Sequence, residues 1–294
     1  MTAEPGDGPG PPPRRARPER ARLSPQALAA ARGGAREGLE WLGRPPESQA
    51  TPLVRVVALV SRFILFVVFR IRVTTSGREH IPKRGGYLVV AALHRGWVDP
   101  FLILHALPLE PRAWFLGSGP SAFSARWREW LLHRLGGMLP VWRGGVGVDQ
   151  HVASARAVLA SGGVFVLVPE GGVTGPPDRP ATFRTGAALI ALRTGAPIVP
   201  IALAGAHELY LGKRLASRIL PVTSARELLD EAWDGVLAEP GSRAEMDLAH
   251  RLTACFADLL APAVAAIYPG TVDPPSRPRR LRGLTWLFLS RRER

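Results

Sequence analysis

Residues 86–100 read GYLVVAALHRGWVDP and combine an apolar run with a polar turn and a helix start. The run 86–93 is short, β-branched in its middle and preceded by charged and glycine residues, so it predicts a buried strand. Asp99 and Pro100 predict the start of a helix, with aspartate as N-cap and proline at the first helical position. His94 would then leave the carboxyl end of the strand.

The turn in this stretch holds a candidate catalytic pair, His94 and Asp99. On a continuous helix these residues would point about 140° apart, but a histidine in a turn can still meet an aspartate at a helix start. A carboxylate bonded to one ring nitrogen fixes the tautomer and leaves the other nitrogen free to take a proton. The alternative is a structural strand-end histidine beside a simple N-cap, so the pair needs support from the rest of the chain.

Beyond residue 71, expected strands alternate with expected helices, which implies one α/β domain with a mostly parallel mixed sheet flanked by helices. A capping box at Ser242 and Glu245 opens a last helix that runs to about Ile267. The expected strands are 72–76, 86–93, 112–116, 138–142, 164–168 and 197–203. The other expected helices are 100–107, 124–134, 149–160 and 185–194.

The N-terminal part divides into two segments. Residues 1–22 are rich in proline, glycine and arginine, so we expect a disordered basic arm without the apolar region of a signal peptide. Residues 23–70 are expected to form membrane-associating helices, one over 24–42 and one over 52–69. In the second helix Arg55 and Arg62 share one stripe opposite a wide apolar face, which favours a helix lying on a membrane. A buried helix and a spanning helix remain alternatives.

The charge of the chain is strongly basic, with a formal net charge of +14 over 294 residues, nearly all from arginine. Such a surface suits anionic lipid, nucleic acid or phosphorylated small molecules. The tail, 271–294, places arginines around the apolar residues 284–289, which indicates an anchor on an anionic membrane surface; a solvated tail is the alternative. Cys255 is the only cysteine, which excludes a disulfide framework and a cysteine metal cluster and suggests a reducing compartment.

Three further stretches end or form strands and carry conspicuous residues. GMLPVWR ends at Arg143, VPEGG carries Glu170, and APIVPIA, residues 196–202, is a strand bracketed by prolines. In an open parallel sheet the ligand site lies beyond the carboxyl ends of the strands, so His94, Arg143 and Glu170 are expected at one edge. The chain contains no GxSxG, GxGxxG or GxxxxGK[ST] motif for serine hydrolysis or nucleotide binding.

The ordered set HxxxxD, GxxPVxR, PEG and a proline-flanked strand resembles the four blocks of the glycerolipid acyltransferase family, over roughly residues 52–215. The resemblance implies a glycerol-3-phosphate acyltransferase-like α/β domain over 71–270 and peripheral or monotopic association with the cytoplasmic face of the membrane. It also implies transfer of a fatty acyl group from acyl-CoA or acyl carrier protein to a lysophospholipid in phospholipid synthesis. The acceptor would be 1-acylglycerol 3-phosphate, and neither cofactor nor metal would be needed.

Carried over residue by residue, the resemblance assigns catalysis to His94 and Asp99. The residues it suggests for substrate binding, with their neighbours, are Arg143, Glu170, Gly171, Gly172 and Arg184. The family commonly has threonine and arginine after the glycine of its third block, where this chain has Gly172 and Val173. In the family that arginine holds the acceptor phosphate. Either one of four other cations binds the phosphate in this chain, or the acceptor lipid carries a different headgroup. These cations are Arg143, Arg184, Lys213 and Arg214.

The chemistry agrees with the resemblance. An alcohol is a poor nucleophile at pH 7, so a base that takes its proton accelerates attack on a thioester by about 10²–10⁴-fold, and an unperturbed imidazole has a suitable pKa of about 6.5. Backbone N–H groups near Gly171, or at the helix that begins with Pro100, are candidate donors to the oxyanion. Two alternatives stay open: an acyltransferase for another lipid or glycolipid acceptor, and a non-catalytic basic protein that binds membrane or nucleic acid. Nucleic acid is not expected as a partner.

Overall fold

The computed structural model describes residues 38–83, 86–118, 126–141, 147–230, 238–276 and 278–287. All of them belong to one unit, residues 36–294. The expected arm, residues 1–22, and Arg143 lie outside the described residues, as does most of the helix expected over 24–42.

The described strands form one sheet of seven strands in the order β1-β7-β6-β2-β5-β3-β4. Every neighbouring pair is parallel except β6 and β7, which are antiparallel. The expectation of a mostly parallel mixed sheet is therefore confirmed. The strand bounds are β1 Arg72–Ser76, β2 Tyr87–Ala92, β3 Ala113–Ser118, β4 Met138–Val141, β5 Val164–Leu167, β6 Ile198–Ala204 and β7 Arg214–Ile219.

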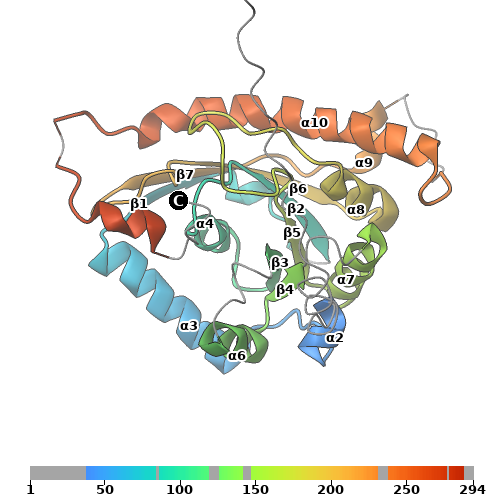
Figure 1. Cartoon of the computed structure of the whole chain (residues 1–294), viewed down its shortest axis with the longest axis horizontal. Coiled ribbons are helices and arrows are strands. Elements are labelled where there is room, and N and C mark those ends of the chain that lie inside the picture. The colour runs from blue at the N-terminus through green and yellow to red at the C-terminus, as the bar shows by residue number, and fades with distance from the viewer. Residues whose placement is uncertain are drawn as a thin grey trace, which may run out of the picture. The chain divides into compact units, whose positions relative to one another are not determined.

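The sheet is covered on both faces, which explains the unbroken apolar run of β2. Leu88, Val90 and Ala92 face one hydrophobic core, whereas Tyr87, Val89 and Ala91 face the other. The first core is shared with α7 (Val148–Ala160), α8 (Gly186–Thr194) and α10 (Arg243–Ile267), and the second with α4 (Asp99–Ala106). Figure 1 shows α10 along one face of the sheet and α4 on the other.

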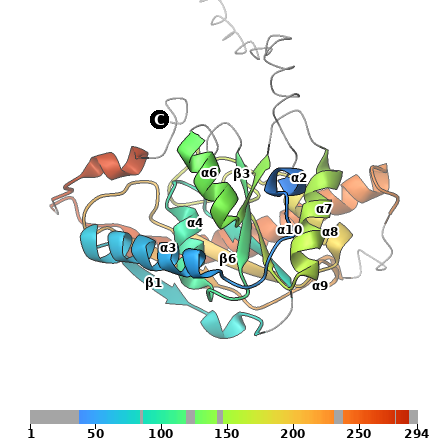
Figure 2. The ribbon, with the colours of Figure 1, turned by 90° about the horizontal axis from the view of Figure 1, so that it is seen from below.

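The remaining helices lie at the rim of this arrangement. They are α2 Gly38–Leu42, α3 Pro52–Arg62, α6 Arg126–Leu135 and α9 Ala225–Leu229, with the π-helix η1 Phe63–Val68 and the 3₁₀ helices η2 Arg78–His80, η4 Tyr268–Thr271 and η5 Arg282–Trp286. Figure 2 shows α3 in front of α4, with α10 behind the sheet.

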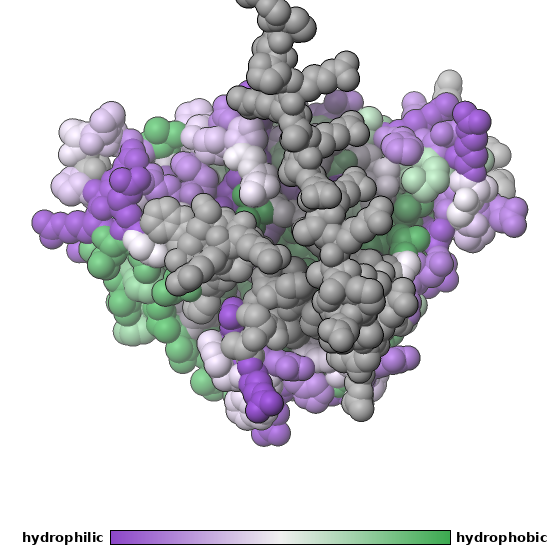
Figure 3. Space-filling view, in the orientation of Figure 1, coloured by the Kyte–Doolittle hydropathy of each residue, from purple (hydrophilic) through white to green (hydrophobic). Residues whose placement is uncertain are grey.

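The helix over 52–68 exposes apolar side chains, as expected for an interfacial helix. Thr51 caps it, and among its residues only Leu65 is buried, whereas Leu59 is 70% exposed. The two arginines turn toward the body of the protein, where Arg55 pairs with Glu110 and Arg62 donates to the Leu104 carbonyl. The apolar surface at the lower left of Figure 3 belongs to this helix. The alternative of an ordinary buried helix is therefore wrong.

One stretch of the described residues, Arg243–Thr271, is long and apolar enough to cross a membrane by length and composition. It comprises α10 and η4. Its buried residues, among them Leu252, Phe256 and Leu260, belong to the core on the sheet. The capping box at its start is present, with the Glu245 amide donating to Ser242 Oγ at 3.2 Å. One face of α10 therefore packs in the core.

Two elements, β7 and α9, were not expected from the sequence. The strand RLASRI carries two arginines and a serine, so its pattern is not that of a buried strand. Its polar groups find partners elsewhere in the fold: Arg214 pairs with Asp273, and Ser217 shares a hydrogen bond with Thr75 on β1. Such partners are distant in sequence, so the local pattern could not reveal the strand.

Candidate active site

His94 and Asp99 form the centre of the site, at the carboxyl end of β2. His94 Nδ1 lies 2.9 Å from Asp99 Oδ2. The histidine side chain is 22% exposed, whereas the aspartate side chain is 1% exposed. Nε2 makes no hydrogen bond to any of the described residues. The expected pair is thus brought together, with the second ring nitrogen available to an incoming group.

Asp99 orients this turn in a way that differs from the expected N-cap. Helix α4 includes Asp99, and its N-cap is Val98 without a side-chain capping bond. Asp99 Oδ2 instead accepts hydrogen bonds from the preceding backbone, from Arg95 N at 2.7 Å and Gly96 N at 2.8 Å. One oxygen therefore fixes both the imidazole and the backbone that carries it, which makes Asp99 the organising residue of the turn. Residues 94–99 are called the catalytic turn below.

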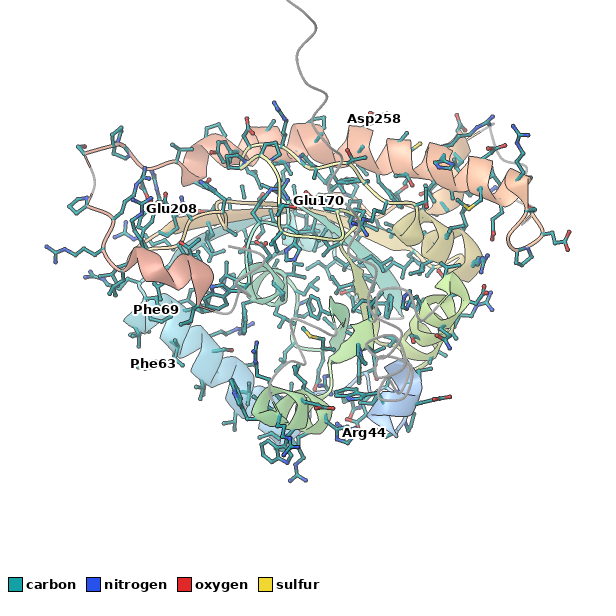
Figure 4. The ribbon with its side chains drawn as sticks, viewed as in Figure 1. Arg44, Phe63, Phe69, Glu170, Glu208 and Asp258 are labelled. Carbon is teal, nitrogen blue, oxygen red and sulfur yellow. The ribbon has the colours of Figure 1, made fainter. Side chains whose placement is uncertain are left out.

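Glu170 follows the neighbouring strand β5, and Figure 4 shows it inside the protein. Its side chain is 0% exposed, and Oε1 accepts from His94 N at 2.8 Å. Oε2 accepts from Ala181 N at 2.8 Å and from Arg95 Nη1. Both of its oxygens thus hold the protein's own backbone and a buried arginine, so Glu170 supports the catalytic turn. That Glu170 also binds substrate stays a prediction.

Arg95 is the functional residue that the sequence analysis missed. Its side chain is 2% exposed, and its guanidinium donates to the carbonyls of His94, Pro176 and Arg179 as well as to Glu170. Gly175 accommodates it, because a Cβ there would lie 2.6 Å from Arg95 Nη2. Arg95 thus fastens the loop 171–181 to the catalytic turn. A signal was present in its position two residues after the expected strand 86–93, since a charged side chain that folds inward there needs buried partners.

Gly171, Gly172 and Arg184 form the rim beside this buried pair. Gly171 has a positive φ of 64°, and a Cβ there would lie 2.9 Å from Arg184 Nε, so the arginine side chain crosses directly over the glycine. The Gly171 amide donates to the Val168 carbonyl, so this one amide is engaged within the turn. The expectation of oxyanion donors near Gly171 or at the start of the helix at Pro100 stays a prediction. A Cβ at Gly172 would meet nothing within 4 Å, so open space lies beside it. Arg184 is exposed and remains a candidate for an anionic substrate group.

Two other proposed replacements for the family arginine, Lys213 and Arg214, have partners within the fold. Lys213 is buried and donates from Nζ to the Thr271 carbonyl at 2.8 Å, and burial lowers its pKa. Arg214 is paired with Asp273 at 3.0 Å. Both are therefore engaged within the fold, and neither is free to hold a phosphate. Arg143 lies outside the described residues.

A second histidine, His207, lies at the same edge of the sheet, in the turn after β6. The turn approaches the catalytic turn closely, because a Cβ at Gly96 would lie 2.7 Å from the Ala206 carbonyl oxygen. Burial lowers the pKa of His207, and the nearby positive charges of Lys213, Arg279 and Arg95 lower it further, while Glu208 opposes them. A neutral imidazole is therefore favoured there.

Known proteins share both the sequence pattern and the fold. Residues 72–204, which include the catalytic turn and Glu170, match the model of the family described as Acyltransferase. Residues 72–204 are an acyltransferase domain. The described fold is also similar to the crystal structure of PlsC, a 1-acyl-sn-glycerophosphate acyltransferase from Thermotoga maritima. This similarity has a TM-score of 0.52 and 19% identity, and it covers 73% of this chain and 79% of that one. No curated protein sequence matches the chain.

The acyltransferase domain confirms the resemblance drawn from the four sequence blocks. The enzyme class expected from the sequence is confirmed with it, as is the α/β fold. The domain spans all strands from β1 to β6, and β7, α10 and the C-terminal segment lie beyond it. Within the domain, among the described residues, Asp99 and Arg95 with Glu170 hold the catalytic turn from two sides.

Proposed function

We propose that this acyltransferase transfers a fatty acyl group from acyl-CoA or acyl carrier protein to the hydroxyl of 1-acylglycerol 3-phosphate. The observation that supports the proposal is the His94–Asp99 pair at the end of β2, with Nδ1 bonded at 2.9 Å and Nε2 without a hydrogen bond to any described residue. PlsC, whose fold is similar, is described as acting on this class of acceptor. No cofactor or metal ion is part of the proposal.

In this mechanism His94 acts as the general base. Nε2 takes the hydroxyl proton of the acceptor as its oxygen attacks the thioester carbonyl carbon, and the negative charge of Asp99 stabilises the imidazolium. The tetrahedral intermediate then collapses, the carbon–sulfur bond breaks, and the thiolate leaves. The imidazolium returns the proton to the sulfur, so the base is regenerated and one histidine suffices.

We propose that Arg184 binds the acceptor phosphate. It would replace the family arginine, at whose position this chain has Val173. Its side chain crosses Gly171, next to the buried Glu170 that holds His94, and it is exposed. A guanidinium suits a phosphate because it donates two parallel hydrogen bonds. Arg143 and Gly172 belong to the same proposed acceptor site, Gly172 because open space lies beside it.

Membrane association is suggested by the apolar face of α3 and η1, which no described residue covers. We propose that this face lies in the cytoplasmic leaflet and that the enzyme is peripheral or monotopic. An anionic surface would also attract the basic tail. The acceptor, a lipid, would then reach the site without leaving the membrane surface.

The test is acyl transfer from labelled palmitoyl-CoA to a panel of acceptors. His94→Ala should abolish transfer, while His250→Ala, an exposed histidine on α10, should leave it unchanged. Full activity of the His94→Ala protein would refute the proposed base. Acyl carrier protein loaded with the same chain would compare the two donors.

The panel also decides between two acceptors, because Gly172 and Val173 stand where the family commonly has threonine and the phosphate-binding arginine. If the phosphate is bound by Arg184, Arg184→Ala should raise KM for 1-acylglycerol 3-phosphate by about tenfold or more. The exposed Arg251→Ala should not change it. Equal use of acceptors with and without a phosphate would instead support acylation of another lipid or glycolipid.

A further inference from the structure

Residues 278–287, here called the C-terminal strap, contact the catalytic turn although they lie far beyond the acyltransferase domain. Trp97, in the middle of the turn, donates from its indole Nε1 to the carbonyl of Leu284 at 2.7 Å. The Leu284 side chain packs in the same core as Val98, the N-cap of α4, and Phe101 in the first turn of that helix. The turn that carries His94 is thus in direct contact with the end of the described chain.

The strap is fixed to the protein by a second set of contacts, at residues 208–211. Thr285 is buried; its Oγ1 accepts from Leu209 N at 2.9 Å and donates to the Leu209 carbonyl at 3.2 Å. The Arg280 carbonyl accepts from Leu211 N at 2.9 Å. A hydroxyl that both accepts and donates in this way fixes the local backbone register, so the Leu284 carbonyl is held at a defined position under Trp97.

Charge reinforces the same attachment. Glu208 pairs with Arg279 at 2.7 Å and with Arg282 at 2.6 Å, and its side chain is mostly buried. Figure 4 shows Glu208 beside the C-terminal strap. Two arginines on one partly buried carboxylate are stronger than a single exposed pair, because burial reduces screening by solvent. These arginines of the basic tail are therefore not simply solvated.

The loop 171–181 and the strap hold two different points of one short turn. On one side Glu170 and Arg95 fix the backbone at His94, and on the other side the strap fixes Trp97. His94 needs its Nδ1 contact with Asp99 to within a few tenths of an ångström for base catalysis, and both residues flank Trp97. A turn released at Trp97 would retain the catalytic residues but lose their fixed geometry.

We propose that the C-terminal strap is a positioning element of the active site, acting through Trp97. Trp97 is a positioning residue: its indole N–H binds the Leu284 carbonyl and so fixes the middle of the catalytic turn. The strap thereby contributes to acyl transfer from outside the acyltransferase domain. This inference rests on the proposed function for its kinetic readout only, since the order of the turn can be measured without substrate.

The strap also carries two exposed leucines, Leu281 and Leu287, and it lies next to the apolar helix segment η1. The two are joined by one short loop, since Leu211 N donates to Arg280 and Gly212 N donates to Phe69, the residue after η1. The strap therefore occupies the side of the protein that the proposal for α3 assigns to the membrane.

The first experiment compares two truncations of the full chain. Removal of residues 277–294 deletes the strap, whereas removal of 288–294 retains it. We expect the first to lower kcat for acyl transfer by at least about tenfold, because several hydrogen bonds and two ion pairs are lost together. We expect the second to match the full chain. Equal kcat for the two truncations would overturn the proposal.

Two point variants keep the test valid if the long truncation fails to fold. Trp97→Phe removes the N–H but keeps an aromatic ring, and Thr285→Val removes the hydroxyl at constant size. Each should lower kcat by about 2- to 10-fold with KM nearly constant. Their double variant should lose little more than one of them, because both act on the same contact. Fully additive losses, or none, would contradict positioning through Trp97. Thr253→Val, whose hydroxyl bonds the Ala249 carbonyl within α10, is the matched control.

Amide hydrogen exchange separates this inference from the proposed function. The amides of Arg95 and Gly96 bond to Asp99 in the ordered turn. Thr285→Val should accelerate their exchange several-fold, and Thr253→Val should not. Faster exchange in a protein that acylates none of the acceptors would support the strap and refute the proposed reaction. Unchanged exchange would overturn the strap even if the enzyme is active.

Discussion

Replacing Glu170 by alanine would leave the guanidinium of Arg95 buried without its counter-charge. The side chains of this pair are 2% and 0% exposed, and the carboxylate also accepts from the amides of His94 and Ala181. Removing one partner of a buried ion pair costs about 3–5 kcal/mol, because the remaining charge cannot be rehydrated. We therefore expect Glu170→Ala to lower the free energy of unfolding by at least about 3 kcal/mol.

The chain offers a matched control in Arg55 and Glu110. Their ion pair has nearly the same length, 2.6 Å against 2.5 Å, but the side chains are 57% and 41% exposed. Exposed pairs contribute about 0–1 kcal/mol, so Glu110→Ala should have little effect. Glu170→Gln, which keeps acceptor and shape but loses the charge, should lie between the two alanine variants.

Urea denaturation followed by circular dichroism measures all three variants, provided that the slope with urea concentration is unchanged. Residual acyl transfer at low temperature would report whether the folded fraction of Glu170→Ala still aligns His94. If Glu170→Ala destabilises the protein no more than Glu110→Ala, burial does not control the strength of this pair, and the reasoning from exposure is refuted.

Three further outcomes follow from the structure. Asp99→Asn should lower kcat by about 10²-fold or more with KM nearly constant, because the imidazolium of His94 loses its counter-charge. Steady-state kinetics that show only a mild loss of kcat would exclude Asp99 as the residue that stabilises the imidazolium. Burial lowers the pKa of His151, so the unfolded chain takes up the proton first; stability should be full above about pH 6.5 and fall as the pH is lowered toward the folded pKa. His151→Gln should reduce that slope in denaturation curves, and an identical slope would contradict the assignment. Replacing the exposed Leu59 and Phe63 of the apolar face by serine should weaken flotation with vesicles by tenfold or more, whereas unchanged flotation would exclude this face as the membrane contact.

The local features of the site could be predicted from the sequence. The strand of residues 86–93 is apolar at every position because both faces of β2 are buried, and its end placed His94 correctly. His94 and Asp99 are near neighbours in the chain, so their contact depends only on a short turn. The stripe of Arg55 and Arg62 was likewise a local pattern, and the structure turns it toward the body of the protein.

Contacts between distant segments could not be predicted in this way. Glu170 follows its strand as expected, but its buried role depends on Arg95 and Ala181, which come from other segments. The basic tail offered a choice between a solvated segment and a membrane anchor, and neither choice includes the bond from Trp97 to Leu284. Composition describes a segment's average surroundings, whereas these roles depend on single partners.

The bridge that Glu170 makes between His94 and Ala181 limits how this enzyme can diversify. The loop 171–181 lies beside the acceptor site proposed above, and it is tied through one carboxylate and one arginine to the catalytic backbone. A lineage that changes its acceptor can vary the exposed positions of the loop, such as Thr174 and Asp178, without disturbing proton transfer. Changes at Glu170 or Arg95 would alter selectivity and rate together, so new specificities should arise around this pair rather than through it.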